Sequence, residues 1–325
     1  NNVSAFATGL YIEYSDTYDT GIPHIYNNII RVDGYYWYNG YGWATSQGLT
    51  LYSCEDFVVT HNSVLNTTYG YNSSAASFSG DDNQIRMNHF VSLGTAFGIY
   101  ANNITAGSSH PNIIEYNNIY TRYTYIAKTM NTSFLELDEF NALMGLYNSD
   151  CNPMYEDDML QTTLPVLDNF GTYCNVDTDF GGYPRNTTTP DIGAWEYTAP
   201  TGNNPLSGTY DIGSGGDYSS IEDFLYDLTY RGVNSAVTAQ LADSLYSGAY
   251  ILDHIPGIGW DRILTFTGAP GQTPVLRYSD QDADSNYSFK LYRSKYVTFN
   301  GITFETEATS YSNLVVPEGF NKFIT

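Results

Sequence analysis

A short phrase of the form apolar-x-x-Asn-x-apolar recurs through the first half of the chain and limits the folds open to it. Its copies place Asn28, Asn62, Asn88 and Asn117 at intervals of 34, 26 and 29 residues. We interpret each copy as two short strands around a turn, because Asn tolerates the left-handed conformation and its amide can bond the same amide in the next repeat. This self-similarity predicts repeats that stack on their neighbours.

A second strand signal precedes several of these phrases, as at Gly9–Ile12, Gly48–Leu51 and Gly98–Ala101. These runs are too short and too rich in β-branched or aromatic residues for helices. Their period-2 alternation turns one face of each strand toward a narrow core. Parallel stacking would satisfy the backbone between neighbouring repeats, so only the ends of the stack would need caps.

Four motifs follow the repeats in a fixed order: Cys151–Tyr155, Leu164–Asp168, Asp179–Arg185 and Pro190–Tyr197, the last reading Pro-Asp-Ile-Gly-Ala-Trp-Glu-Tyr. Together with the repeats, this order resembles the C-terminal segments of secreted bacterial proteins of the right-handed parallel β-helix superfamily. Pectate lyases, polygalacturonases and many large bacterial surface proteins share that fold. The resemblance implies that Pro190–Tyr197, the closing motif, ends a β-helix.

A second unit is expected after a linker at 199–206, where turn-forming residues replace any periodicity. Residues 208–222 resemble the opening of another β-helix: a strand, a Gly-rich turn, and a helix with Ser219-x-x-Glu222 as its capping box. Four further strands are predicted at Val237–Leu241, Ile263–Phe266, Val275–Tyr278 and Tyr296–Phe304.

The expected fold is therefore all-β, with two tandem right-handed parallel β-helix (solenoid) units. Residues 1–198 would be the C-terminal part of one β-helix and residues 207–325 the N-terminal part of another, opened by a short capping α-helix. We expect the polypeptide to continue beyond both ends as part of a longer protein.

The charge balance excludes several partners. Thirty-five acidic residues against 12 Lys and Arg give a net charge of −23, a field that repels nucleic acid, anionic lipid and polyanionic sugars. No apolar run approaches the ~20 residues of a membrane span, so we expect no membrane insertion. The tyrosine-rich, lysine-poor composition is typical of secreted bacterial β-proteins and predicts an extracellular or bacterial cell-surface location.

The three cysteines leave the disulfide state open. Cys151 and Cys174 are close enough in sequence to bridge the end of the first unit, which would leave Cys54 buried and unpaired.

Asp81 and Asp82 are the first catalytic candidates. Polygalacturonases carry an Asp pair that works as general acid and base with a third carboxylate. The rest of that signature, a Gly-His-Gly and an Arg-Ile-Lys, is missing from the chain. The alternative interpretation is a solvated Gly-Asp-Asp-Asn turn between repeats.

Lyase chemistry needs a base or a neutralising cation, commonly Lys or Arg and often helped by Ca²⁺. The acidic surface argues against a polyuronate substrate. The cations of the first unit are few: Arg31, Arg86, Arg122, Lys128 and Arg185.

Calcium is the one cofactor that the sequence suggests. Asp280, Asp282, Asp284 and Asn286 alternate oxygen ligands as a Ca²⁺ loop does, although the Gly and the final Glu of an EF-hand are absent. An exposed acidic loop without metal is the alternative.

An aromatic segment is the main candidate for binding. Exposed rings stack on sugars or form protein interfaces. The segment could instead fold back over the flank of the stack. Its aromatic members are Tyr35, Tyr36, Trp37, Tyr38, Tyr41 and Trp43.

The leading functional interpretation is non-enzymatic: a stalk or adhesin segment of a large surface protein that binds cell-surface glycans or other surface proteins. The alternative is a carbohydrate-active enzyme, either a polysaccharide lyase or a glycoside hydrolase, because one fold hosts both kinds of function.

Overall fold

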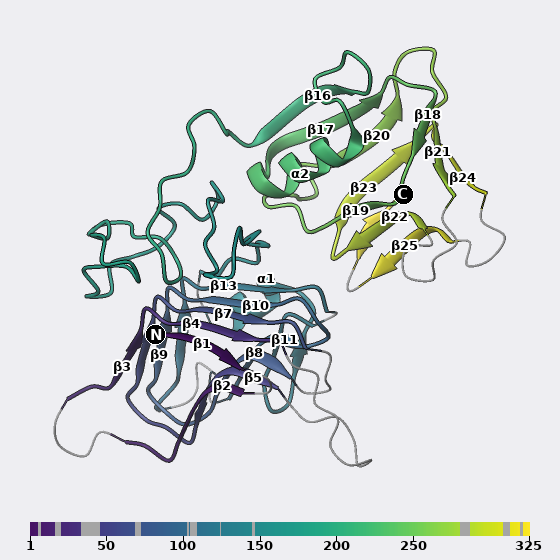
Figure 1. Cartoon of the computed structure of the whole chain (residues 1–325). Helices are drawn as coiled ribbons and strands as arrows, with labels where there is room; N and C mark the ends of the chain where they lie inside the picture. The colour runs from purple at the N-terminus through teal and green to yellow at the C-terminus, as the bar shows by residue number, and fades with distance from the viewer. Residues whose placement is uncertain are drawn as a thin grey trace. The chain divides into compact units, whose positions relative to one another are not determined.

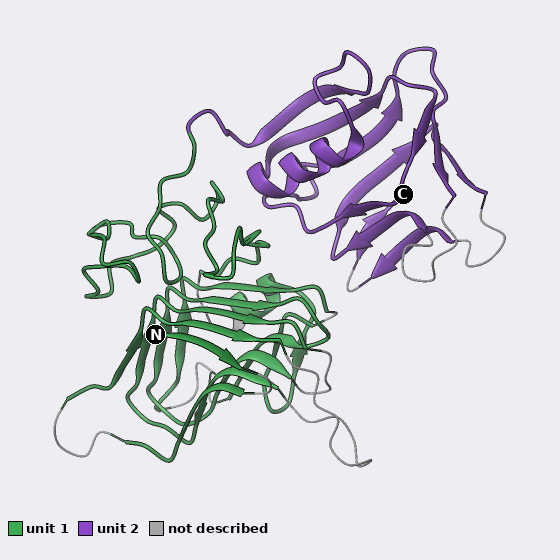
Figure 2. Cartoon of the chain, in the orientation of Figure 1, with its two compact units in different colours: residues 1–200 green, residues 201–325 purple. Residues whose placement is uncertain are grey.

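The computed structural model describes all residues except 6–7, 17–20, 34–45, 69–72, 103, 105–108, 124, 145–146, 280–286, 308–312 and 319–320. The described chain is dominated by parallel β-sheets and has few helices. It divides into two compact units, residues 1–200 and 201–325 (Figure 2), and the division falls inside the segment 199–206.

Three sheets form the first unit, and each successive repeat adds one strand to each sheet (Figure 1). The first sheet, in spatial order, consists of β1 (Asn2–Ala5), β4 (Ile29–Val32), β7 (Ser63–Asn66), β10 (His89–Ser92) and β13 (Asn118–Thr121). The second consists of β15 (Ser133–Phe134), β14 (Ala127–Lys128), β11 (Phe97–Ala101), β8 (Ser74–Phe78), β5 (Gln47–Tyr52) and β2 (Thr8–Glu13). The third consists of β12 (Ile113–Glu115), β9 (Gln84–Arg86), β6 (Val58–Thr60) and β3 (His24–Tyr26).

The strands of this unit pair in parallel, with equivalent positions of consecutive repeats side by side. Only β14 and β15 pair antiparallel among the named strands. In the first sheet Ile30 lies beside Val64, Val64 beside Phe90, and Phe90 beside Ile119. All four side chains are fully buried, so the register builds a continuous apolar column through the core.

The Asn of each repeated phrase bonds its copy in the next repeat, as the sequence predicts. Asn28 Nδ2 donates to Asn62 Oδ1 at 2.7 Å, and equivalent bonds continue through Asn88, Asn117 and Asn148. The expected backbone conformation was wrong, because the left-handed residue is the one before each ladder Asn. Those left-handed residues are Asn27, His61, Met87 and Tyr116.

The Gly of the second strand signal is needed for close packing between sheets. A Cβ on Gly48 would lie 2.2 Å from Val64 Cγ1, and one on Gly98 would lie 2.7 Å from Ile119 Cγ2. Glycine at these positions therefore lets the apolar column of the first sheet approach the second.

Helix α1 (Leu137–Met144) lies beside the last strands of the first unit. Its Leu137 and Phe140 belong to the main core cluster, and the Phe140 ring meets Phe134 at 5.4 Å. Asn141 Oδ1 accepts from Asn148 Nδ2 at 2.9 Å, so the helix ends the asparagine ladder. The sequence pattern does not indicate this helix.

The segment 151–197, which we call the closing segment, runs along the outer face of the first sheet. Leu160 and Ala194 pack there against the outward side chains Leu65 and Val91. The main-chain N–H of Ala194 donates to Ser63 Oγ at 3.0 Å, and that of Gly193 donates to the Met87 carbonyl at 2.8 Å. Pro190–Tyr197 thus covers the side of the middle repeats rather than the end of the stack.

Three further sheets make up the second unit. The first has the order β16 (Leu206–Ile212), β17 (Val233–Leu241), β20 (Leu264–Gly268), β23 (Lys295–Asn300) and β26 (Lys322–Ile324). The second has β18 (Leu245–Ser247), β21 (Val275–Tyr278) and β24 (Thr303–Thr306), and the third has β19 (Tyr250–Leu252), β22 (Tyr287–Tyr292) and β25 (Asn313–Glu318). Every pairing within these sheets is parallel. Three of the four predicted strands form β17, β20 and β21, the first two with shifted ends. The fourth, Tyr296–Phe304, forms two strands, β23 and β24, which flank Gly301 and belong to different sheets.

Helix α2 (Ile221–Arg231) forms where the sequence predicts it and packs against the edge strands β16 and β19. Its apolar stripe of Ile221, Phe224, Leu225 and Leu228 is buried. The cap is displaced by one residue, because Ser220 Oγ accepts from the main-chain N–H of Asp223 at 3.1 Å. Across the described residues, helices capable of crossing a membrane are lacking.

Candidate functional site

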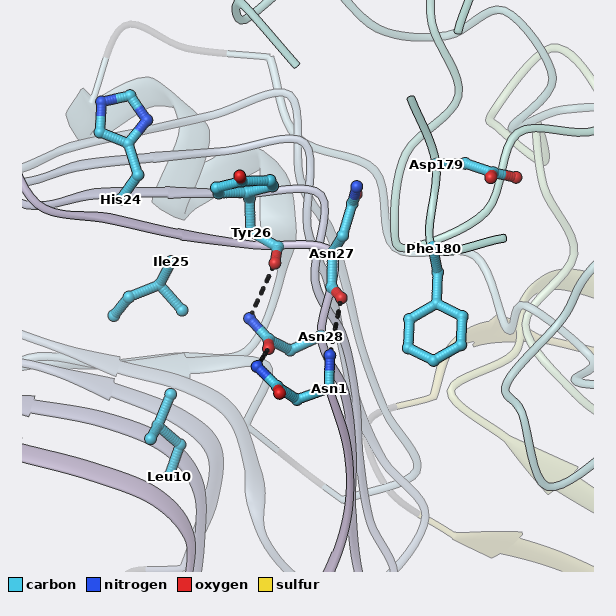
Figure 3. A pocket seen from close by; sticks show the side chains of 9 residues that line it. All are labelled: Asn1, Leu10, His24, Ile25, Tyr26, Asn27, Asn28, Asp179 and Phe180. Carbon is cyan, nitrogen blue, oxygen red and sulfur yellow. Dashed lines mark hydrogen bonds between the residues drawn. The ribbon is translucent and has the colours of Figure 1, made fainter. Parts of the chain in front are cut away.

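A cavity of about 630 Å³ lies where the closing segment meets the first strands of the first unit. Figure 3 shows Tyr26 and Asn27 on one side of it and Phe180 on the other. The residues that line it are Asn1, Leu10, His24, Ile25, Tyr26, Asn27, Asn28, Asp179 and Phe180.

The walls of this cavity combine fixed polar groups with exposed rings. Asn27 is held rigidly, since its Nδ2 donates to the Thr178 carbonyl at 2.7 Å and its Oδ1 accepts from Arg185 at 3.0 Å. Tyr26 is half exposed, and His24 is also exposed. An aromatic face beside amide and carboxylate groups suits a small polar ligand with an apolar face, such as a sugar ring.

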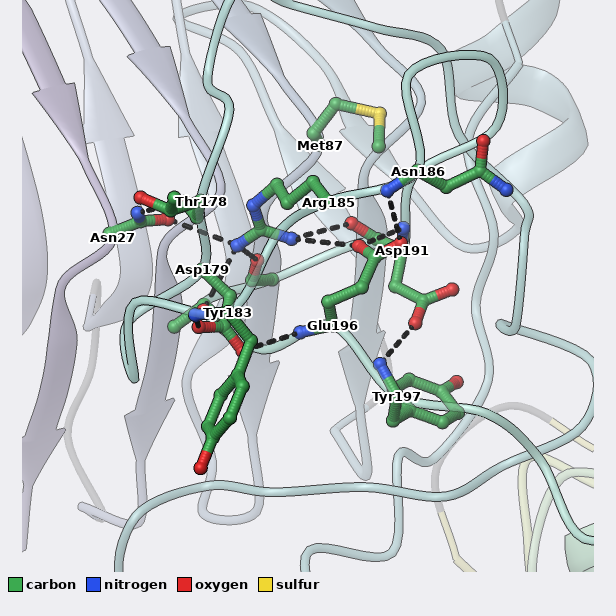
Figure 4. Close-up of polar contacts among 12 residues, drawn as sticks. Asn27, Met87, Thr178, Asp179, Tyr183, Arg185, Asn186, Asp191, Glu196 and Tyr197 are labelled. Carbon is green, nitrogen blue, oxygen red and sulfur yellow. Dashed lines mark hydrogen bonds and ion pairs between the residues drawn. The ribbon is translucent and has the colours of Figure 1, made fainter.

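Arg185 anchors the closing segment beside this cavity (Figure 4). Its guanidinium is fully buried and pairs with Glu196 at 3.2 Å. It also donates to the carbonyls of Gly193 and Ala194, at 3.0 and 2.9 Å, and to the side chain of Asn27, which lies between β3 and β4. One cation thus ties the motif Asp179–Arg185 to the closing motif and to the repeats.

Carboxylates outnumber cations in this buried network. Asp179 accepts from the main-chain N–H of Tyr183 at 2.9 Å, and Asp191 accepts from that of Tyr197 at 2.7 Å. Burial raises the pKa of Asp191 from 3.8 to about 7. Because Arg185 is the cation of the network, a proton on Asp191 removes an excess buried negative charge.

Buried histidines lie beneath the closing motif. Burial, with Arg185 nearby, lowers the pKa of His61 well below its ordinary range, and burial lowers that of His89 to about 4. Gly193 sits directly on His89, since a Cβ there would lie 2.1 Å from His89 Cδ2. These rings are neutral packing surfaces and not solvent-accessible bases.

The structure places the catalytic candidates Asp81 and Asp82 in a partly exposed turn between β8 and β9. Asp82 Oδ2 lies 2.7 Å from His110 Nδ1, and this hydrogen bond raises the pKa of His110. Asp82 is left-handed, with φ of 54°. The turn is therefore partly open to solvent and brings Asp82 to a histidine that the sequence pattern does not place beside it.

The cations considered for lyase chemistry have structural partners. Arg31 pairs with Asp33 at 3.2 Å, Arg86 with Glu115 at 2.6 Å, and Lys128 lies 5.3 Å from the Phe97 ring centroid. Arg122 directly follows β13, and Arg185 belongs to the network described above.

Two predicted sites lie outside the described residues. They are the aromatic segment with Tyr35, Tyr36, Trp37, Tyr38, Tyr41 and Trp43, and the calcium candidate with Asp280, Asp282, Asp284 and Asn286. Within the portion of the chain that the structure describes, no group of three or more His, Cys, Asp or Glu side chains could hold a metal ion.

The candidate bridge between Cys151 and Cys174 is not formed, and all three cysteines are free. Burial raises the pKa of Cys151 to about 12, which keeps it a thiol. Cys54 is buried, as expected.

A group of exposed tyrosines on β2 and β5 was not predicted. Tyr14 and Tyr52 meet edge to face at 5.5 Å, and Tyr11 and Glu13 face outward from β2 beside them. Only the alternation of Gly9–Ile12 could have indicated that Tyr11 points to solvent, since Tyr14 and Tyr52 lie at strand ends.

Comparison of the chain with known protein families, with curated proteins and with solved structures gives no match.

Proposed function

We propose that this chain is a stalk or adhesin segment of a bacterial surface protein, built from two right-handed parallel β-helix units and acting without catalysis. The observation that carries the proposal is the rigid stack itself, in which each repeat bonds the next through its asparagine. A stack of this kind holds exposed side chains at fixed spacing, as an adhesive surface or a stiff spacer requires.

The ligands proposed are cell-surface glycans or other surface proteins at an extracellular location. The cavity beside Tyr26 and Phe180 offers aromatic and amide contacts for a neutral sugar. The net charge of −23 favours neutral or basic ligands over polyanions.

Glycan arrays probed with the intact chain test this proposal. We expect binding to neutral oligosaccharides to fall about fivefold in Tyr26→Ala or in Trp37→Ala and Trp43→Ala, because stacking on an aromatic ring contributes about 1 kcal/mol. Tyr147→Ala is the control, since Tyr147 is exposed in the same unit and does not line the cavity. Equal binding by all variants would place the ligand at a different surface.

A carbohydrate-active enzyme is the second candidate function, and the contact between Asp82 and His110 favours it. A carboxylate beside a histidine of raised pKa can exchange a proton with a substrate. Release of reducing or unsaturated ends from a polysaccharide, abolished by Asp81→Asn or Asp82→Asn, would establish this function. Retention of the release in both variants would exclude this turn as the site.

A further inference from the structure

In the second unit, the ammonium group of Lys290 is surrounded by aromatic rings and a carboxylate. Lys290 Nζ lies 4.6 Å from the ring centroid of Tyr287 and 5.6 Å from that of Tyr292. It also pairs with Glu318 Oε1 at 3.0 Å. Two tyrosine rings and one carboxylate therefore hold an ammonium group, by cation–π attraction and charge.

The first unit presents the same groups on its surface. Tyr52 lies directly beside Glu13 on the neighbouring parallel strand, just as Tyr292 lies beside Glu318. Tyr14 supplies the second ring, 5.5 Å from Tyr52 and nearly perpendicular to it.

In the first unit, a threonine stands at the position that corresponds to Lys290. Lys290 precedes Tyr292 by two positions, and the residue two positions before Tyr52 is Thr50. Among the residues that the structure describes, Glu13 has no ion pair. The carboxylate and the two rings are thus present in the first unit, and β5 provides no ammonium group to bind between them.

Exposure makes these groups available to a partner. The exposed fractions are 47% for Tyr11, 71% for Tyr14 and 44% for Tyr52, and Glu13 is also exposed. Interaction with Tyr52 raises the pKa of Tyr14, so its ring stays neutral at physiological pH. The field of a chain with net charge −23 would steer a basic partner toward it.

We infer that Tyr11, Glu13, Tyr14 and Tyr52 form a surface site that binds a Lys or Arg side chain of a partner polypeptide. The inference names one partner class within the proposed adhesive role and rests on that role. It shares no residue with the cavity beside Tyr26, so each can fail without the other.

Fluorescence anisotropy with labelled hexalysine, at an ionic strength of about 0.15 M, tests the inference. We expect Tyr14→Leu with Tyr52→Leu to weaken binding about tenfold, and Glu13→Gln to weaken it about threefold. Tyr14→Phe with Tyr52→Phe should bind within about twofold of the unaltered chain, because the rings remain. Tyr183→Leu is the matched control and should change nothing.

Three results would overturn the inference. Unchanged binding by the leucine pair would mean that hexalysine responds only to the overall charge. Equal loss in the phenylalanine and leucine pairs would mean that hydroxyl groups, not ring faces, make the contact. Loss of maltohexaose binding in the leucine pair with hexalysine binding unchanged would make this a sugar surface. Failure of the glycan test at Tyr26 and Trp37 would leave the hexalysine result unaffected.

Discussion

Asn62 gives two hydrogen bonds to a single oxygen of Asn88: its main-chain N–H donates to Asn88 Oδ1 at 3.0 Å, and its Nδ2 donates to the same atom at 2.9 Å. Asn88 Nδ2 in turn donates to the carbonyls of Val59 and Arg86 and to Asn117 Oδ1. Each ladder amide therefore satisfies backbone groups at a buried corner that strand pairing leaves open.

Asn88→Ala should destabilise the first unit by about 3 kcal/mol, because it leaves buried donors of Asn62 and carbonyls of two strands without partners. Asn131→Ala is the control, since Asn131 is exposed in the same unit. Urea unfolding of both variants checks the prediction. Equal stabilities would show that the ladder contributes little.

Gly193→Ala should release the closing segment from the sheet. Gly193 has φ of 86°, and an added Cβ would meet His89 Cδ2 at 2.1 Å. Gly182→Ala is a matched control, because Gly182 has φ of 83° but no atom within 4 Å of the added Cβ. Amide hydrogen exchange over residues 151–197 should accelerate in the first variant only. Similar exchange in both variants would mean that backbone strain, and not the contact with His89, accelerates exchange.

The fold could be predicted further from the sequence than the site could. The repeated Asn phrases and α2 depend on local patterns, so their strands and helix were found within a few residues. Segment 151–197 has no such periodicity, and its path depends on contacts such as that of Ala194 with Ser63, 131 residues away. Its position along the side of the stack was therefore not predictable from spacing.

Arg185→Leu should cost about 3–5 kcal/mol, since it leaves Glu196 and neighbouring carboxylates buried without their cation. Arg31→Leu removes partly exposed pairs with Asp33 and with Asp158 and should cost no more than about 1 kcal/mol. Thermal or urea unfolding compares the two. A larger loss in Arg31→Leu would contradict the anchoring role of Arg185.

The stability of the first unit should fall as pH rises through about 7. The pKa of Asp191 is raised from 3.8 to about 7, so the folded state holds a proton that the unfolded chain releases above about pH 4. The stability linked to this proton is fully present below about pH 4 and is lost once the pH passes about 7. Unfolding free energies between pH 5 and 8 should decline in the unaltered chain and stay flatter in Asp191→Asn. Parallel profiles would assign the dependence to other groups.

We propose that this chain binds surface ligands and does not cleave them. The most direct measurement incubates the intact chain with neutral and acidic polysaccharides, follows retention on each, and analyses the soluble products by mass spectrometry. We expect retention on a neutral glycan with no new reducing or unsaturated ends. Products that appear with the unaltered chain and disappear in Asp82→Asn would contradict it.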